Sequence, residues 1–168
     1  MELKRFFLEL LEREAASSRK VVERVPEGQN DWKPHPRSME MGYLAALVAS
    51  MPGWLEFMIN RDELNLADPS NEMMRTKAVE TRAELLRLLE AGLEKSRKAL
   101  EDTTDEHLMK LWRFRLDDRV AGEGPRYMMI AEAALTHMAH HRGQLTVYLR
   151  LNEAKVPSIY GPSADERF

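Results

Sequence analysis

The sequence contains no cysteine. A disulfide framework, a thiolate metal site and a cysteine nucleophile are therefore all excluded. An excess of one charge is missing as well, because 25 Lys and Arg are interspersed with 28 Asp and Glu. No basic stripe of the kind that binds nucleic acid is present, so we expect no nucleic-acid partner.

Long hydrophobic runs are also missing. No apolar run approaches the roughly 20 residues that a membrane span needs. The first residues, MELKRFFLELLERE, lack the uninterrupted apolar stretch of a signal peptide. We therefore expect a cytoplasmic protein without a membrane partner. The length of 168 residues predicts a single domain over residues 1–168.

The sequence does contain patterns that are typical of helices. Methionine is frequent and β-branched residues are few, which favours helices over sheet. Apolar residues recur at the helical period over residues 3–24, 38–61 and 78–101. Ser38 is the expected N-cap of the second helix, and Pro52 is expected to kink it or to mark an irregular turn. Residues 62–77 are polar and are predicted to be mostly loop.

Shorter elements are predicted before the last helix and after it. Thr103 or Thr104 can cap a short helical turn. The alternation that follows predicts a β-hairpin of residues 111–116 against 119–123. The proline-containing tail after Asn152 is expected to cross the end of the helices as ordered coil.

The stretch over residues 126–151 is the organising element of the chain. It reads RYMMIAEAALTHMAHHRGQLTVYLRL and predicts one long helix with three histidines in its middle. Together, the four long amphipathic segments predict an all-α protein built as a four-helix bundle. Bundle cores commonly hold metal ions on facing helices.

His137 and His141 lie four residues apart and are therefore neighbours on one helix face. Two imidazoles at this spacing can reach a single metal ion, although such pairs are more often structural. Gln144 and Tyr148 share that face, and His140 lies at its edge. Position 138 is Met, so the general base of a His-Glu-x-x-His protease is absent.

Two stretches resemble the DinB/YfiT-like superfamily of bacterial four-helix bundles. They are HMAHHRGQLTVYLRLNEAKVPSIYGPSADE at residues 137–166 and KPHPRSMEMGYLAALVASMPGW at residues 33–54. The resemblance implies up-down-down-up connectivity and a homodimer. It also implies a divalent metal, nickel or zinc, held by three histidines, one on the second helix and two on the last.

Only two of these three ligands are present at matching positions. His137 and His141 match the pair on the last helix, whereas the position on the second helix falls at Leu47 in YLAALVAS. Leucine cannot coordinate a metal, and Tyr43, which flanks it, is a poor zinc ligand. His35, between two prolines, is a candidate replacement ligand or pocket residue, although surface histidines are more common in such a setting.

Two functions remain open from the sequence. In the first, the protein is an enzyme of the kind found among DinB relatives: a thiol-cofactor-dependent transferase or isomerase, or a hydrolase. A metal on His137 and His141 would activate water or a thiol. His140, Gln144 or Tyr148 would then orient a small-molecule substrate.

In the second, the protein is a non-catalytic bundle with a degenerate, weakly binding metal site. Leu47 packs against the two histidines, which are satisfied by each other, by the Tyr43 or Tyr148 hydroxyl, or by water. The missing third ligand favours this second function. DNA binding is a distant third possibility because the charged residues form no basic stripe that could bind DNA.

Overall fold

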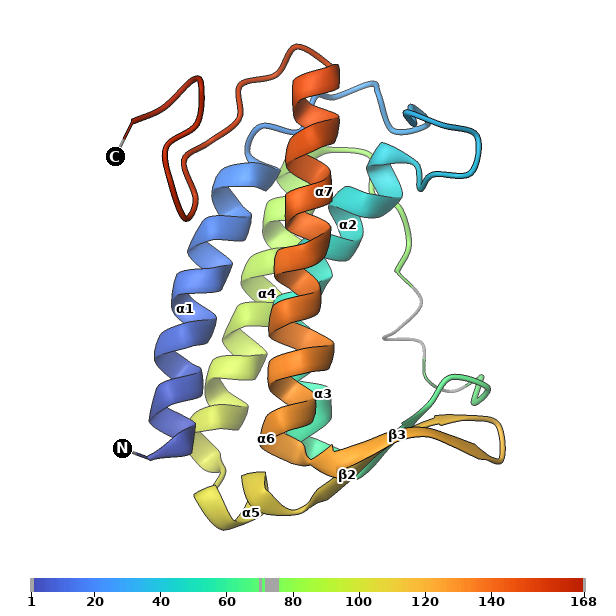
Figure 1. Ribbon diagram of the computed structural model, residues 1–168, viewed down its shortest axis with the longest axis vertical. Helices are drawn as coiled ribbons and strands as arrows, with labels where there is room; N and C mark the ends of the chain where they lie inside the picture. The colour runs from blue at the N-terminus through green and yellow to red at the C-terminus, as the bar shows by residue number, and fades with distance from the viewer. Residues whose placement is uncertain (1, 70, 72–75, 168) are drawn as a thin grey trace.

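The computed structural model describes residues 2–69, 71 and 76–167. The fold is rich in helix, with long helical segments side by side and a small sheet at one end (Figure 1). Helices α2 (Met41–Ser50) and α4 (Arg82–Asp102) both run toward the sheet end, whereas α1 (Leu3–Val22) and α7 (His137–Leu151) run away from it (Figure 1). The long helices are α1 (Leu3–Val22), α4 (Arg82–Asp102) and the segments of the second and last helices described below.

The second helix is divided into three parts, as the proline predicted. α2 (Met41–Ser50) and α3 (Trp54–Asn60) are joined by a 3₁₀ turn, η1 (Met51–Gly53), that contains Pro52. The prediction that no apolar run approaches the length of a membrane span is wrong for Met41–Asn60, which is apolar and long enough by length and composition alone. Most of it (78% of its most apolar window) is buried inside the protein, as in the core helix of a globular fold.

The predicted cap of the second helix is wrong. The N-cap residue is Glu40 rather than Ser38, and its side chain makes no capping bond. The N–H groups of Met41 and Gly42 instead donate to carbonyls of the preceding link, at 2.8 and 2.9 Å. Because these long-range bonds satisfy the first amides of α2, a local side-chain cap is not required.

Side-chain caps do define the neighbouring helices. α4 begins four residues later than predicted, because Thr81 and Glu84 form a reciprocal capping box at 3.2 and 3.0 Å. Of the two candidate threonines, Thr104 caps α5 (Asp105–Met109), with its hydroxyl 3.2 Å from the His107 amide. The first amides of α1 donate to the carboxylate of Asp105, about a hundred positions along the chain.

The predicted hairpin is confirmed, but the chain is not purely α-helical. β2 (Leu111–Leu116) pairs antiparallel with β3 (Arg119–Pro125), and β1 (Glu63–Asn65) adds to β2 in parallel. β1 lies in the segment that was predicted as loop. Three residues are too few to show the alternation of a strand, and the parallel partner is about fifty positions away.

The last helix covers the predicted residues 126–151 but is not a uniform α-helix. It consists of α6 (Arg126–Met129), a π-helical segment (Ile130–Thr136) and α7 (His137–Leu151). At the end of the π segment, the His137 amide reaches the Glu132 carbonyl, five residues earlier. Such π segments are frequent at functional sites because they shift the side chains that follow them.

The tail is ordered coil, as expected, and packs on the helices. The buried guanidinium of Arg142 donates to Glu14 on α1 and to the Tyr160 hydroxyl in the tail. The carboxylates of Asp165 and Glu166 accept hydrogen bonds from the Val156 and Ser158 amides. The tail therefore joins the ends of α1 and α7 (Figure 1).

Candidate functional site

His137 and His141 are in direct contact. Their Nε2 atoms lie 2.8 Å apart, and their ring centroids 4.5 Å apart. On the far side of the pair, the Nδ1 atom of His141 is 2.8 Å from Gln144 Oε1. The Nδ1 atom of His137 is 3.3 Å from the carbonyl of Ala133 in the π segment. Each imidazole nitrogen of the pair therefore has a neighbour within the last helix.

The protons of this network follow from its acceptors. An amide oxygen only accepts, so His141 donates Nδ1–H to Gln144 Oε1 at 2.8 Å, and in its neutral form its Nε2 accepts from His137 Nε2–H. Burial lowers the pKa of His141, and the neighbouring His137 and His140 lower it further, whereas the Gln144 hydrogen bond opposes them. Burial thus favours the neutral form of His141.

The second helix reaches the pair through aromatic and aliphatic side chains. The Trp54 ring centroid is 5.7 Å from that of His137. Leu47 is 7% exposed and belongs to the same core cluster as Trp54 and Met138. Among residues 2–69, 71 and 76–167, no three His, Asp or Glu side chains converge in an arrangement that could hold a metal ion.

This donor set does not fit a zinc or nickel ion held by three protein ligands. Leu47, the position that the resemblance assigns to the third imidazole, is a buried apolar side chain. Two nitrogens bound to one zinc ion at a tetrahedral angle are about 3.3 Å apart. The observed 2.8 Å between the Nε2 atoms is the distance of a hydrogen bond, so metal binding would have to break that bond and open the pair.

The other predicted site residues are dispersed. His140 is exposed, with its ring centroid 5.1 Å from that of His141. The Tyr148 hydroxyl donates to the Met39 carbonyl at 3.0 Å, so of the partners predicted for the histidines the structure shows each other rather than Tyr148. Tyr43 is 38% exposed on α2. His35 is exposed in the link before α2, where its Nδ1 accepts the Arg37 amide at 3.2 Å, so it is not a third metal donor.

An apolar cavity beside His137 was not predicted. Its volume is about 300 Å³, and it lies between α3, the sheet and the π segment. Four aromatic side chains line it: Trp54, Phe57, Trp112 and Phe114. The aromatic residues at alternate positions of β2 hinted at an apolar sheet face, but only the folded chain brings that face to α3.

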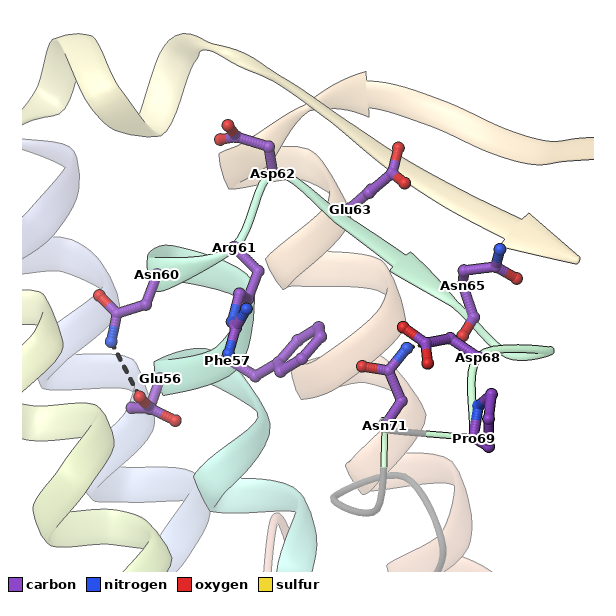
Figure 2. A pocket seen from close by; sticks show the side chains of 10 residues that line it. All are labelled: Glu56, Phe57, Asn60, Arg61, Asp62, Glu63, Asn65, Asp68, Pro69 and Asn71. Atoms are coloured by element: carbon purple, nitrogen blue, oxygen red, sulfur yellow. Dashed lines mark hydrogen bonds between the residues drawn. The ribbon is translucent and has the colours of Figure 1, made fainter. Parts of the chain in front are cut away.

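A second hollow, of about 600 Å³, is polar and lies on the other side of Phe57. Figure 2 shows its side chains spread around the hollow rather than directed at one point. Its carboxylates already have partners: Glu56 accepts from Asn60, Asp62 pairs with Arg126, and Glu63 lies 3.8 Å from Arg115. The hollow is therefore not arranged to surround a cation.

The fold and the site define a class of protein: a helix-rich bundle with a histidine pair on its last helix and a cavity next to it. The chain belongs to the DinB family, whose model matches residues 2–167. A search of the curated proteins found no match.

Two solved structures share this fold. A DinB-like protein from Bacillus cereus has a TM-score of 0.69 at 17% identity, with 92% of this chain and 95% of that chain covered. A DinB-like protein from Bacillus subtilis has a TM-score of 0.65 at 18% identity, with 89% and 94% covered.

Proposed function

We propose that this DinB-family protein has a degenerate divalent-metal site and no metal-dependent activity. In this proposal the chain is one domain, a four-helix bundle with up-down-down-up connectivity. His137 and His141 are the remnants of the metal site, and zinc or nickel binds them only weakly. The histidine pair then acts as a structural element that links the last helix to Trp54.

The observation that carries this proposal is the hydrogen bond between the two Nε2 atoms. A metal ion would need these two nitrogen atoms as ligands, but they are hydrogen-bonded to each other at 2.8 Å. The third donor position is a leucine packed in the core. A divalent ion would have to break the pair and be solvated next to an apolar side chain, and both steps oppose binding.

Titration calorimetry with zinc and nickel tests this directly, on protein purified without a histidine tag. The wild-type protein should show no submicromolar binding. Leu47→His supplies the third imidazole and should bind at least about tenfold more tightly, a difference of about 1.4 kcal/mol. His137→Ala in the Leu47→His background should abolish the gain.

Tyr43→His is the matched control, because it adds an imidazole to α2 one turn, or about 5.4 Å, away from position 47. It should not tighten binding. Stoichiometric, submicromolar zinc binding by the wild-type protein that is lost in His141→Ala would contradict the proposal. It would favour the metal-dependent transferase or hydrolase instead.

The proposal also includes a homodimer and a cytoplasmic location. Support for the dimer comes from family resemblance and from large apolar side chains left exposed near the sheet and along the last helix, among them Leu111, Leu116, Met128 and Val147. Sedimentation equilibrium at micromolar concentration should give twice the 19.5 kDa chain mass. A 19.5 kDa species alone would contradict the dimer.

A further inference from the structure

We propose that the apolar cavity between α3, the sheet and the π segment binds an uncharged, mostly aromatic small molecule with one oxygen acceptor. This inference does not depend on the fate of the metal site. The cavity of about 300 Å³ is at the lower end of the range typical of small-molecule sites.

The side chains that line the cavity determine the charge and shape of the ligand that it can bind. Buried side chains form its floor: Trp54, Met58, Leu64 and Trp112. Among the described residues, the lining contains no Asp, Glu, Lys or Arg, so a charged ligand would lose its hydration without gaining an ionic partner there. Aromatic walls of this kind favour flat, apolar rings.

The polar atoms of the cavity lie at the end formed by Trp54 and His137. The Trp112 indole N–H is already used by the Arg61 carbonyl at 2.9 Å. The Trp54 Nε1 atom is buried and has no hydrogen-bond partner among the described residues. Buried N–H groups are nearly always hydrogen-bonded, so this donor points to an acceptor that is supplied from outside the chain. The Trp54 ring contacts that of His137, which also lines the cavity, so this unpaired donor lies toward the His137 end.

Neighbouring glycine and alanine residues keep the cavity open. A Cβ on Gly122 would meet only the Met129 side chain, at 4.0 Å, so a larger residue has room to enter. Ala133 lines the cavity from the π segment. Gly122 can therefore be enlarged without a steric clash in the backbone, and a larger side chain at Ala133 would extend into the cavity that this residue lines.

The test uses N-phenyl-1-naphthylamine, an uncharged fluorescent aromatic probe, with EDTA present to remove metal ions. The wild-type protein should bind it saturably and one to one, with energy transfer from tryptophan. Ala133→Leu and Gly122→Val should each weaken binding at least tenfold. Ala139→Leu, the same change at a half-buried position of α7 outside the cavity, is the matched control and should leave binding unchanged.

The polar end is tested by competition. 2-Naphthol should displace the probe at several-fold lower concentration than 2-methylnaphthalene, which has a similar shape but no oxygen. Trp54→Phe keeps an aromatic ring and removes the N–H, so this difference should shrink. Circular dichroism of each variant verifies the fold, and two filling variants on different elements keep the test valid if one fails to fold.

Three results would overturn the proposal. They are absence of saturable binding, equal weakening by Ala133→Leu and Ala139→Leu, and equal displacement by the two competitors. Probe binding that vanishes as the protein concentration rises would show that a second copy of the chain fills the cavity. Because EDTA is present, tight zinc binding in the separate calorimetry would refute the proposed function and leave this result unaffected.

Discussion

Gly53 and Gly92 are in close backbone contact where the η1 turn crosses α4. A Cβ built on Gly92 would lie 2.9 Å from the Gly53 nitrogen and 3.1 Å from its Cα. Both contacts are to backbone, which cannot move aside as a flexible side chain can. The contact fixes the turn directly before Trp54 and so positions the indole that meets His137.

Gly92→Ala should destabilise the protein. Alanine is favoured over glycine within a helix by about 1 kcal/mol. The clash with Gly53 should exceed this gain and leave a net loss of about 1–3 kcal/mol, as for other overpacked sites. Urea denaturation measures the free energy of unfolding.

The control is Gly143→Ala in α7, where nothing lies within 4 Å of the added Cβ, and it should stabilise the protein by up to about 1 kcal/mol. Equal stabilisation by both variants would refute the steric argument.

Arg142→Met should cost more stability than removal of a surface arginine. Arg142 is 1% exposed and lies 2.5 Å from the Glu14 carboxylate and 3.1 Å from the Ser18 hydroxyl. Its loss leaves a carboxylate that is 12% exposed without its partner, which typically costs about 3–5 kcal/mol.

Arg5→Met removes an exposed ion pair with Glu9 and serves as the control. It should change the free energy of unfolding by about 0–1 kcal/mol. Thermal or urea denaturation compares the two variants, and equal effects would show that the buried network contributes little.

Acid should loosen the C-terminal tail. The Arg150 side chain, followed by the Val156 amide, lowers the pKa of Asp165 from its ordinary 3.8. The Ser158 amide, followed by Arg24, lowers the pKa of Glu166 from its ordinary 4.5. Both groups bind fewer protons in the folded state, so their stabilisation is complete above the ordinary values and is lost as the pH falls through the lowered ones.

Amide hydrogen exchange, corrected for intrinsic rates, measures this loosening. Protection at Val156 and Ser158 should be full at pH 6 and should fall below about pH 4, near the ordinary carboxyl pKa. Asp165→Asn should reduce protection of Val156 at every pH and remove most of its pH dependence. Protection that stays constant down to the acid unfolding of the whole protein would contradict the prediction.

His141 should take up its proton at a lower pH than an ordinary histidine does. Burial holds the pKa of His141 below its ordinary 6.5, so the unfolded chain binds the proton more readily than the folded one. The stability that this provides is therefore complete above pH 6.5 and decreases as the pH falls through the lowered pKa.

Nitrogen-15 NMR of the His141 imidazole, with a chelator present, gives the midpoint of its titration. It should lie below 6.5. Gln144→Leu removes the hydrogen bond that raises the pKa of His141 and should lower the midpoint further. A midpoint above 6.5 would show that His141 is stabilised in its charged form.

Local chemistry in the sequence determined much of this protein. The helices follow from the periodic spacing of apolar residues, and the hairpin follows from alternation around a turn in which Asp117 has a φ of 56°. The contact of His137 with His141 also follows from the sequence, because residues four apart on a helix are neighbours whatever the rest of the chain does.

Only the tertiary structure decided the rest, because those features depend on groups far apart in the chain. The short strand β1 exists through its pairing with β2, and the first amides of α1 are capped by Asp105. The Tyr148 hydroxyl donates to the Met39 carbonyl, 109 positions away in the sequence, rather than to the histidines. The walls of the cavity beside His137 come from α3, the sheet and the last helix, so no local pattern could predict its volume or an indole N–H without a partner among the described residues.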